Sequence, residues 1–174
     1  MVDYVKLFPT ELAKFGLPSQ ENRTGCSYAD VPNQKLLETV KKVLCDQKNF
    51  PSLPKGKFDF SKLSCANELP PADIQDAYRT RCASILIHLA NGKIYGVKQM
   101  AHKFKRVQNR GVRTNVVKDA NRGLIRFIFQ SLENMKLIEK VDGSNDRRSG
   151  RKISKKGTSL VYSTAHSMNF PKSN

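Results

Sequence analysis

Acidic residues are scarce along one long stretch of this 174-residue sequence. Residues 78–156 contain 5 Asp and Glu but 20 Lys and Arg, a net charge of +15, whereas residues 1–77 contain 10 of each. Surfaces that serve only solubility usually mix both signs of charge. The imbalance therefore favours a polyanionic partner, either a nucleic acid or an acidic membrane face.

Long apolar segments are lacking as well. The most apolar run, CASILIHLA at residues 82–90, is far too short to span a bilayer. The first residues, MVDYVKLFPTELAKFG, contain no apolar core of a signal peptide. We therefore expect a soluble, intracellular protein that has no membrane partner.

Cysteine is present only four times, as Cys26, Cys45, Cys65 and Cys82, and never in a CxxC or CxH spacing. A structural zinc site needs clustered ligands, and disulfides belong to oxidising compartments for which the sequence has no secretory signal. We expect free thiols, no bound metal and no cofactor.

Motifs for nucleotide binding and nucleophilic catalysis are absent, because the sequence contains no P-loop, no GxGxxG and no GxSxG. His88 lies in an apolar helical pattern, where a core or half-buried position is expected. His102 lies among cations, which suits phosphate contact better than proton transfer, and Asp73 and Asp76 fit the positive N-terminal end of a helix. The sequence predicts neither an enzyme nor a small-molecule substrate.

Proline and glycine divide the first half of the chain. Residues 1–33 are interrupted repeatedly and predict an N-terminal extension that is extended or loosely docked. Leu and Val at helical spacing predict a helix over residues 33–47. Residues 50–71 contain four prolines and permit only turns or one short helix. A strong helix follows over residues 70–91, with Pro71 in its first turn.

The second half predicts a different order of elements. Residues 93–101 indicate a short helix or turn, and residues 102–114 a poorly periodic basic loop. A helix is expected over residues 118–135, followed by strands at 136–141 and 151–154 that are joined by a basic loop. This order predicts a mainly α fold, a winged helix-turn-helix-like helical domain with a small C-terminal β-hairpin, the wing.

The basic residues fall on four neighbouring elements of this predicted fold. The candidates for nucleic-acid contact are Arg79, Arg81, Lys103, Lys105, Arg106, Arg110, Arg113, Arg122, Arg126, Arg147, Arg148, Arg151, Lys152, Lys155 and Lys156. Guanidinium groups match phosphate oxygens bidentately, and lysines act beside them as point charges. The helix at 118–135 offers only Asn121, Arg122 and Arg126 for base edges, so the pattern favours folded RNA recognised by shape and phosphate.

Three segments resemble a known family. They are RTRCASILIHL at 79–89, NRGLIRFIFQSLENMKLIEK at 121–140 and GRKISKKG at 150–157. Together they are similar, over about residues 34–166, to the eukaryotic and archaeal small-subunit ribosomal protein numbered nineteen in the eukaryotic series. The resemblance implies a winged-helix-like fold that binds small-subunit ribosomal RNA in the head of the subunit. By this resemblance Arg81, the 103–113 loop and Arg126 are the expected RNA contacts.

The resemblance also implies the biological setting. We expect neighbouring small-subunit head proteins as partners and a requirement for the protein in small-subunit maturation and pre-rRNA processing. The expected location is the cytoplasmic ribosome, with assembly in the nucleus and nucleolus if the source is eukaryotic. The expected division is an extension at 1–33, an RNA-binding domain at 34–166 and a flexible tail at 167–174.

Two other functions fit the same fold. A winged-helix DNA-binding regulator would select duplex sequences, and a winged-helix protein-interaction module would bind its partner insensitively to nuclease and salt. A steep fall of affinity with salt would instead indicate phosphate neutralisation.

Overall fold

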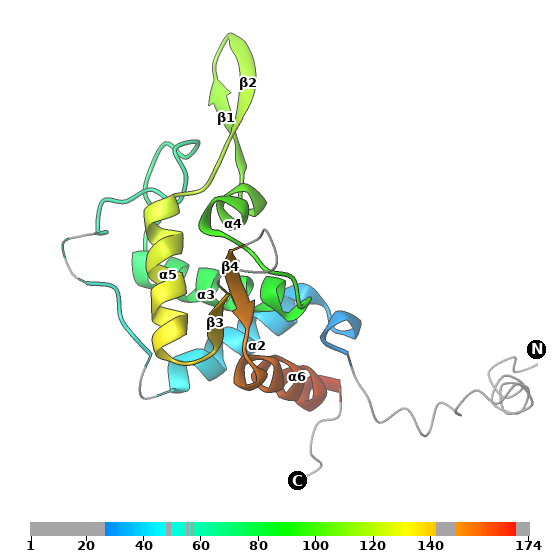
Figure 1. Ribbon diagram of the computed structural model, residues 1–174. Helices are drawn as coiled ribbons and strands as arrows, with labels where there is room; N and C mark the ends of the chain where they lie inside the picture. The colour runs from blue at the N-terminus through cyan, green and yellow to red at the C-terminus, as the bar shows by residue number, and fades with distance from the viewer. Residues whose placement is uncertain (1–26, 48–49, 55, 57, 142–148, 170–174) are drawn as a thin grey trace, which may run out of the picture.

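The computed structural model describes residues 27–47, 50–54, 56, 58–141 and 149–169 (Figure 1). The elements are, in order, η3 (Tyr28–Asp30), α2 (Asn33–Asp46), α3 (Ile74–Ala90), α4 (Val97–Lys103), β1 (Arg106–Arg110), β2 (Arg113–Lys118), α5 (Arg122–Asn134), β3 (Ile138–Val141), β4 (Gly150–Ile153) and α6 (Lys155–Asn169). The proposed division into extension, domain and tail stays a prediction. The helix α6, however, runs three residues into the range assigned to the tail.

Helix α3 forms the centre of the helical body. Its buried side chains spread over about half of its circumference, and they are Tyr78, Cys82, Ala83, Ile85, Leu86 and Leu89. Helices α2, α5 and α6 all pack against it. The helix begins after Asp73, whose side chain accepts hydrogen bonds from the backbone N–H groups of Gln75 and Asp76 at 2.8 and 3.2 Å. Pro71 therefore lies before the helix and not in its first turn.

Helix α2 confirms the prediction made from the Leu and Val spacing. Leu36, Val40 and Leu44 recur every fourth residue and are fully buried. Between α2 and α3, the proline-rich segment forms turns and no helix among its described residues. The short element η3 docks beside this body, because the ring of Tyr28 meets that of Tyr162 edge-on at 5.6 Å.

The winged-helix prediction is confirmed by α5 and the β3–β4 hairpin. Strands β3 and β4 are antiparallel, with Ile138 opposite Ile153 and Glu139 opposite Lys152. Tyr95 extends this small sheet through two backbone hydrogen bonds to Arg151, at 3.0 and 3.1 Å. The wing loop, with Arg147 and Arg148, lies outside the described residues.

Residues 102–114 do not form the loop that the sequence indicated. Helix α4 continues to Lys103, and strands β1 and β2 form a two-stranded antiparallel hairpin that projects from the helical body (Figure 1). Gly111 makes the turn with a φ of 67°, a value that favours glycine. The strands were missed because neither face is buried, so the sequence shows no contrast between apolar and polar positions.

Helix α6 was missed because Ser, Thr and a glycine dominate its start. Val161, Thr164 and Ala165 are nonetheless spaced for one helical face and are buried. Gly157 lies in the first turn, where an added Cβ would collide with the carbonyl oxygen of Leu137. The predicted return strand of the wing therefore ends at Ile153 and leads directly into a helix.

Candidate nucleic-acid interface

The β1–β2 hairpin carries cations on one of its faces. Arg106 lies opposite Lys118, and Arg110 lies opposite Arg113. Side chains directly opposite one another in an antiparallel pair share a face, and alternate residues of a strand return to it. A shift in register between Gln108 and Arg110 keeps both pairs on the same face. All four cations are exposed, and like charges in such pairs destabilise the hairpin.

The opposite face of the hairpin carries one apolar pair. Val107 and Val117 form a cross-strand pair there, with exposed fractions of 61% and 51%. Val112 stands fully exposed in the turn. Cations therefore gather on one face of the hairpin and one pair of valines lies on the other, and neither face is covered by the described residues.

The base of the hairpin is anchored on α3 through Phe104. The guanidinium of Arg81 stacks on the Phe104 ring at 4.1 Å from its centre. His88 lies about two helical turns beyond Arg81 on α3, and its ring meets the Phe104 ring edge-on at 5.5 Å. Burial, and then the charge of Arg106, lower the pKa of Arg81 below its ordinary value. Arg81 is thus held half-buried beside the cationic face, and His88 is half-buried as the sequence predicted.

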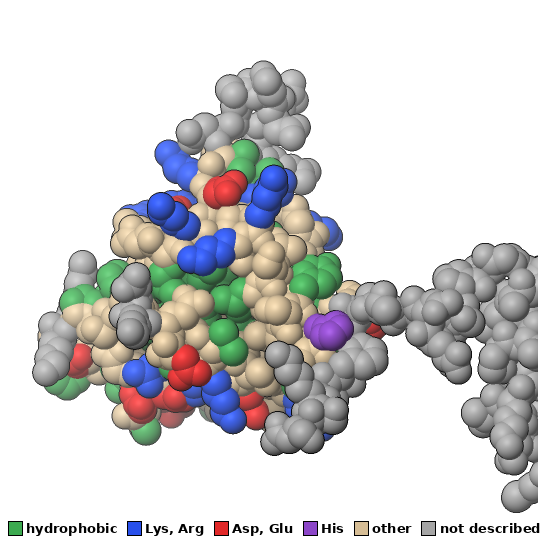
Figure 2. Space-filling model, turned by 90° about the horizontal axis from the view of Figure 1, so that it is seen from below, with side chains coloured by type: hydrophobic (Ala, Val, Ile, Leu, Met, Phe, Trp, Pro, Cys, Tyr) green, Lys and Arg blue, Asp and Glu red, His purple; other side chains and the backbone are tan. Residues whose placement is uncertain are grey.

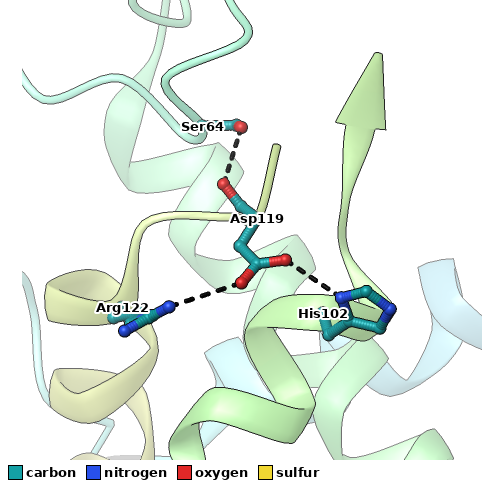
Figure 3. A network of polar contacts seen from close by, with 4 residues as sticks. All are labelled: Ser64, His102, Asp119 and Arg122. Carbon is teal, nitrogen blue, oxygen red and sulfur yellow. Dashed lines mark hydrogen bonds and ion pairs between the residues drawn. The ribbon is translucent and has the colours of Figure 1, made fainter. Parts of the chain in front are cut away.

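A carboxylate network joins the hairpin to α5, as Figure 3 shows. The side chain of Asp119 binds Nδ1 of His102 at 3.0 Å and Nη2 of Arg122 at 3.4 Å. The backbone carbonyl oxygen of Asp119 accepts a hydrogen bond from the hydroxyl of Ser64 at 2.9 Å. The hydrogen bond with His102 is the largest cause that lowers the pKa of Asp119; partial desolvation opposes it, and Arg122 adds to it.

This network changes two predicted contacts. His102 and Arg122 both face the carboxylate of Asp119, so they help to hold the base of the hairpin, and the charge of Arg122 is partly balanced there. Sequence analysis missed Asp119, although its signal was visible: it is the one acidic residue between residues 78 and 132. A lone acid in a basic segment is a good candidate for a structural ion pair.

The remaining cations of the two helices point outward. Arg79 on α3 and Arg126 on α5 are exposed and have no ion-pair partner among the described residues. Arg126 lines a shallow cleft of about 310 Å³ beside α5. Arg81 and the hairpin cations are thus brought together at one end of the molecule, whereas Arg126 lies on the outer surface of α5.

Arg151, like Arg122, has an ion-pair partner among the described residues, but its side chain is much more buried than that of Arg122. Its Nε donates to Oε1 of Glu133 at 2.8 Å, and its guanidinium lies 5.3 Å from the centre of the Phe129 ring. Both partners of the ion pair are more than two thirds buried. Arg151 therefore fastens the wing to α5, and we leave it out of the proposed contact surface.

The other cations in and after the wing that the structure describes are exposed. Lys152 lies on β4, and Lys155 and Lys156 occupy the first turn of α6. Figure 2 shows Lys and Arg side chains gathered at the β3–β4 end of the lower face, with acidic side chains mainly at the opposite end. Cations at a helix N-terminus add to its positive dipole end, so this position favours an anion.

The structure also bears on the predicted absences. No described helix is long and apolar enough to cross a membrane. Within the described ranges, no three His, Cys, Asp or Glu side chains are grouped to hold a metal ion. Cys45, Cys65 and Cys82 are free thiols, and Cys26 lies outside the described residues.

Comparison with known proteins identifies the family. A family model described as ribosomal protein S19e matches residues 27–170. The chain belongs to the ribosomal protein S19e family. The small ribosomal subunit protein eS19 of Emericella nidulans is 32% identical over 133 residues, which cover 76% of this chain and 85% of that protein.

Two yeast relatives agree with this assignment. The small ribosomal subunit protein eS19A of Saccharomyces cerevisiae is 30% identical over 133 residues, or 76% of this chain and 88% of that protein. The eS19A protein of Schizosaccharomyces pombe is 30% identical over 144 residues, or 83% and 94%. Membership of the S19e family confirms the resemblance seen in the sequence, and also that the chain is a ribosomal structural protein and not an enzyme.

Proposed function

We propose that this S19e protein is a structural constituent of the small ribosomal subunit that binds ribosomal RNA of the head through its basic surface. The observation that carries the proposal is the cationic face of the β1–β2 hairpin, where two pairs of like charges lie directly opposite each other. The proposed contacts are Arg79, Arg81, Lys103, Lys105, Arg106, Arg110, Arg113, Arg126, Arg147, Arg148, Lys152, Lys155 and Lys156, with Arg122 at the edge of the surface.

The hairpin supports this proposal because its charge is unfavourable without a partner. Cross-strand pairs contribute on the order of 0.2–1 kcal/mol each, and like charges contribute with the destabilising sign. Phosphate oxygens would neutralise both pairs and would turn the penalty into charge-assisted hydrogen bonds. Such contacts fix orientation and give affinity without reading sequence.

The cap of α5 argues against the DNA-binding alternative. Asn121 is one of three residues that the sequence offers for base edges on this helix, but its Oδ1 accepts from the N–H groups of Gly123 and Leu124. Its Nδ2 donates to the hydroxyl of Ser61 and to the carbonyl of Lys62. The amide has little remaining capacity for a base edge, so the N-terminal turn of α5 offers no free amide for base readout, and backbone recognition of folded RNA fits better.

The biological role follows as part of the same proposal. Because the curated relatives are named as small ribosomal subunit proteins, we infer neighbouring small-subunit head proteins as further partners. We also infer that the protein is required for small-subunit maturation and pre-rRNA processing. It would act on cytoplasmic ribosomes and join the subunit in the nucleus and nucleolus if the source is eukaryotic.

The test is sucrose-gradient sedimentation of a tagged full-length chain in low salt, after a moderate salt wash and after nuclease. We expect the wild type to migrate with small subunits and polysomes, and the double variant R110E/R113E to shift to light fractions. K42E/K35E on α2 makes the same charge change in the neutral half of the chain and should migrate like the wild type. A wild-type protein found only in light fractions or on chromatin would overturn the proposal.

A further inference from the structure

We infer that the turn at Phe58–Ser61 and the adjacent surface of α5 form a binding site for one unpaired RNA nucleotide. The inference rests on the proposed function and adds to it a site and a ligand, a base stacked on Phe60 with its phosphate held by Arg126. No cation of the hairpin takes part in it.

Phe60 is the first observation. It exposes 90% of its side chain, the largest exposed fraction among the aromatic residues that the structure describes. A large apolar ring held in water has a solvation cost that a stacked base would remove. Base stacking on aromatic side chains is the usual means by which proteins bind single-stranded RNA.

The turn that presents Phe60 is firmly attached to the body. The N–H of Ser61 closes the turn on the carbonyl of Phe58 at 2.8 Å. The side chain of Asn121 donates to the Ser61 hydroxyl at 2.8 Å, and the N–H of Asn121 donates to the carbonyl of Leu63, also at 2.8 Å. Little conformational entropy would therefore be lost when a ligand binds to this turn.

Packing beneath the turn also holds it against the body. The ring of Phe58 is 8% exposed and lies 5.6 Å from that of Phe127, which in turn lies 5.9 Å from the buried ring of Tyr78. Phe58 thus anchors the turn in the core, while its neighbour two residues along faces water. The two phenylalanines have different tasks, one in packing and the other on the surface.

A cleft adjoins this turn. It measures about 310 Å³ and is lined by Phe58, Ser61, Gly123, Arg126, Phe127 and Gln130. This volume lies at the lower end of the range for small-ligand sites, roughly 300–1,000 Å³, and so suits a single nucleotide-sized group. In the sequence, Phe60 lies between Phe58 and Ser61, which both line the cleft.

The chemistry of the lining selects a nucleotide. Arg126 supplies a guanidinium with no described carboxylate partner, which suits a phosphate. Gln130 is exposed one helical turn further along α5 and offers both donors and an acceptor to a base edge. An apolar protein partner would bury the charge of Arg126 without compensation, which is strongly unfavourable. The cleft lining contains no acidic side chain, and the carboxylate of Asp59 in the turn accepts a hydrogen bond from the N–H of Gly56 at 2.8 Å.

The test is binding of the full-length chain to a single-stranded oligouridylate carrying one fluorescent purine analogue, whose emission falls when it stacks. We expect Phe60→Ala to weaken binding by about 5- to 100-fold and to abolish the quenching. Phe60→Trp should restore both. Leu69→Ala, a change at a residue 77% exposed in the same segment, should bind like the wild type.

Salt dependence distinguishes the phosphate contact of Arg126 from the stacking contact of Phe60. Arg126→Gln should reduce the slope of log affinity against log salt by about 0.7, because one phosphate contact is lost. Phe60→Ala should leave that slope unchanged. Fully duplex RNA should bind the wild type and Phe60→Ala equally, since paired bases are not available for stacking.

Three results would overturn the inference. If Phe60→Ala binds and quenches like the wild type, the turn is not a stacking site, although the hairpin could still carry the proposed function. If Phe60→Ala keeps its RNA affinity but leaves the small subunit in a gradient, Phe60 contacts a protein. If the wild-type chain binds no RNA at all, the proposed function fails together with the site.

Discussion

Arg110 and Arg113 lie directly opposite each other on one face of the β1–β2 hairpin, on either side of its turn. We expect Arg113→Glu to stabilise the hairpin by roughly 0.2–1 kcal/mol, because it replaces a repulsive pair by an attractive one. The same change should weaken binding to ribosomal RNA. Hydrogen exchange of the β1 and β2 amides measures the first effect, and filter binding measures the second.

Lys42→Glu, on α2, is the matched control because it changes the net charge equally. It should leave hairpin exchange unaltered and reduce RNA binding much less. If Arg113→Glu lowered hairpin protection and RNA affinity together, the loss of binding would reflect a disordered hairpin and not a missing charge.

Asp119 should contribute stability only while it is ionised. Its pKa is lowered in the folded protein, so the contribution is present above the ordinary Asp value of 3.8 and is lost as pH falls through the folded pKa. Asp119→Asn should therefore lower the urea midpoint at neutral pH, and the difference from the wild type should shrink in acid. Asp46→Asn, at an exposed site, should show no such difference. A gap that persists undiminished in acid would contradict this role of the charge.

His88 should give the protein a second pH dependence, nearer neutrality. Burial, and then the charge of Lys103, lower its pKa below the ordinary 6.5. The unfolded chain then binds more protons than the folded one, so stability should fall as pH drops below 6.5. Unfolding in urea between about pH 8 and about pH 5 would measure this slope. His88→Phe keeps a ring against Phe104 and should flatten it; equal slopes would exclude His88 as the cause.

The hydroxyl of Tyr78 is buried in the core without a hydrogen-bond partner among the described residues. The side chain is fully buried. The Ser131 hydroxyl nearby donates to the carbonyl of Phe127 instead, and burial raises the pKa of Tyr78. Tyr78→Phe should therefore be neutral or stabilising, within about 1 kcal/mol.

Tyr78→Ala provides the contrast at the same site. Removing the ring should cost about 3–5 kcal/mol, because it leaves a cavity against the rings of Phe50 and Phe127. Chemical denaturation measures both variants. A loss above about 1.5 kcal/mol in Tyr78→Phe would show that the hydroxyl has a hydrogen-bond partner after all.

The sequence predicted those elements whose burial leaves a periodic signal. Helices α2 and α5 show apolar residues at helical spacing, and the wing strands are bounded by clear turn residues. The hairpin at 106–118 was missed because both of its faces are exposed to solvent. Apolar and polar residues therefore do not alternate regularly along its strands. Helix α6 was missed because Gly157 and a run of Ser and Thr disguised the spacing of Val161 and Ala165.

The candidate site was predictable as a list of residues and not as an arrangement. Charge alone selected the basic residues, but only the folded structure shows that Glu133 holds Arg151 and that Asp119 holds Arg122. The sequence offers Asn121 as one of three side chains for base edges, yet its amide is occupied by the helix cap and by a segment 60 residues away. Contacts of such sequence separation leave no pattern in the sequence.

The projecting hairpin amplifies small rotations at its base into larger displacements of its tip. Five residues of β1 extend about 17 Å at the usual rise of a strand, so a swing of about 10° at its base would move the tip by about 3 Å, the length of one hydrogen bond. An isolated two-stranded hairpin has little rigidity of its own. The aim of the tip therefore depends on the contacts at its base, those of Arg81 with Phe104 and of Asp119 with its two partners.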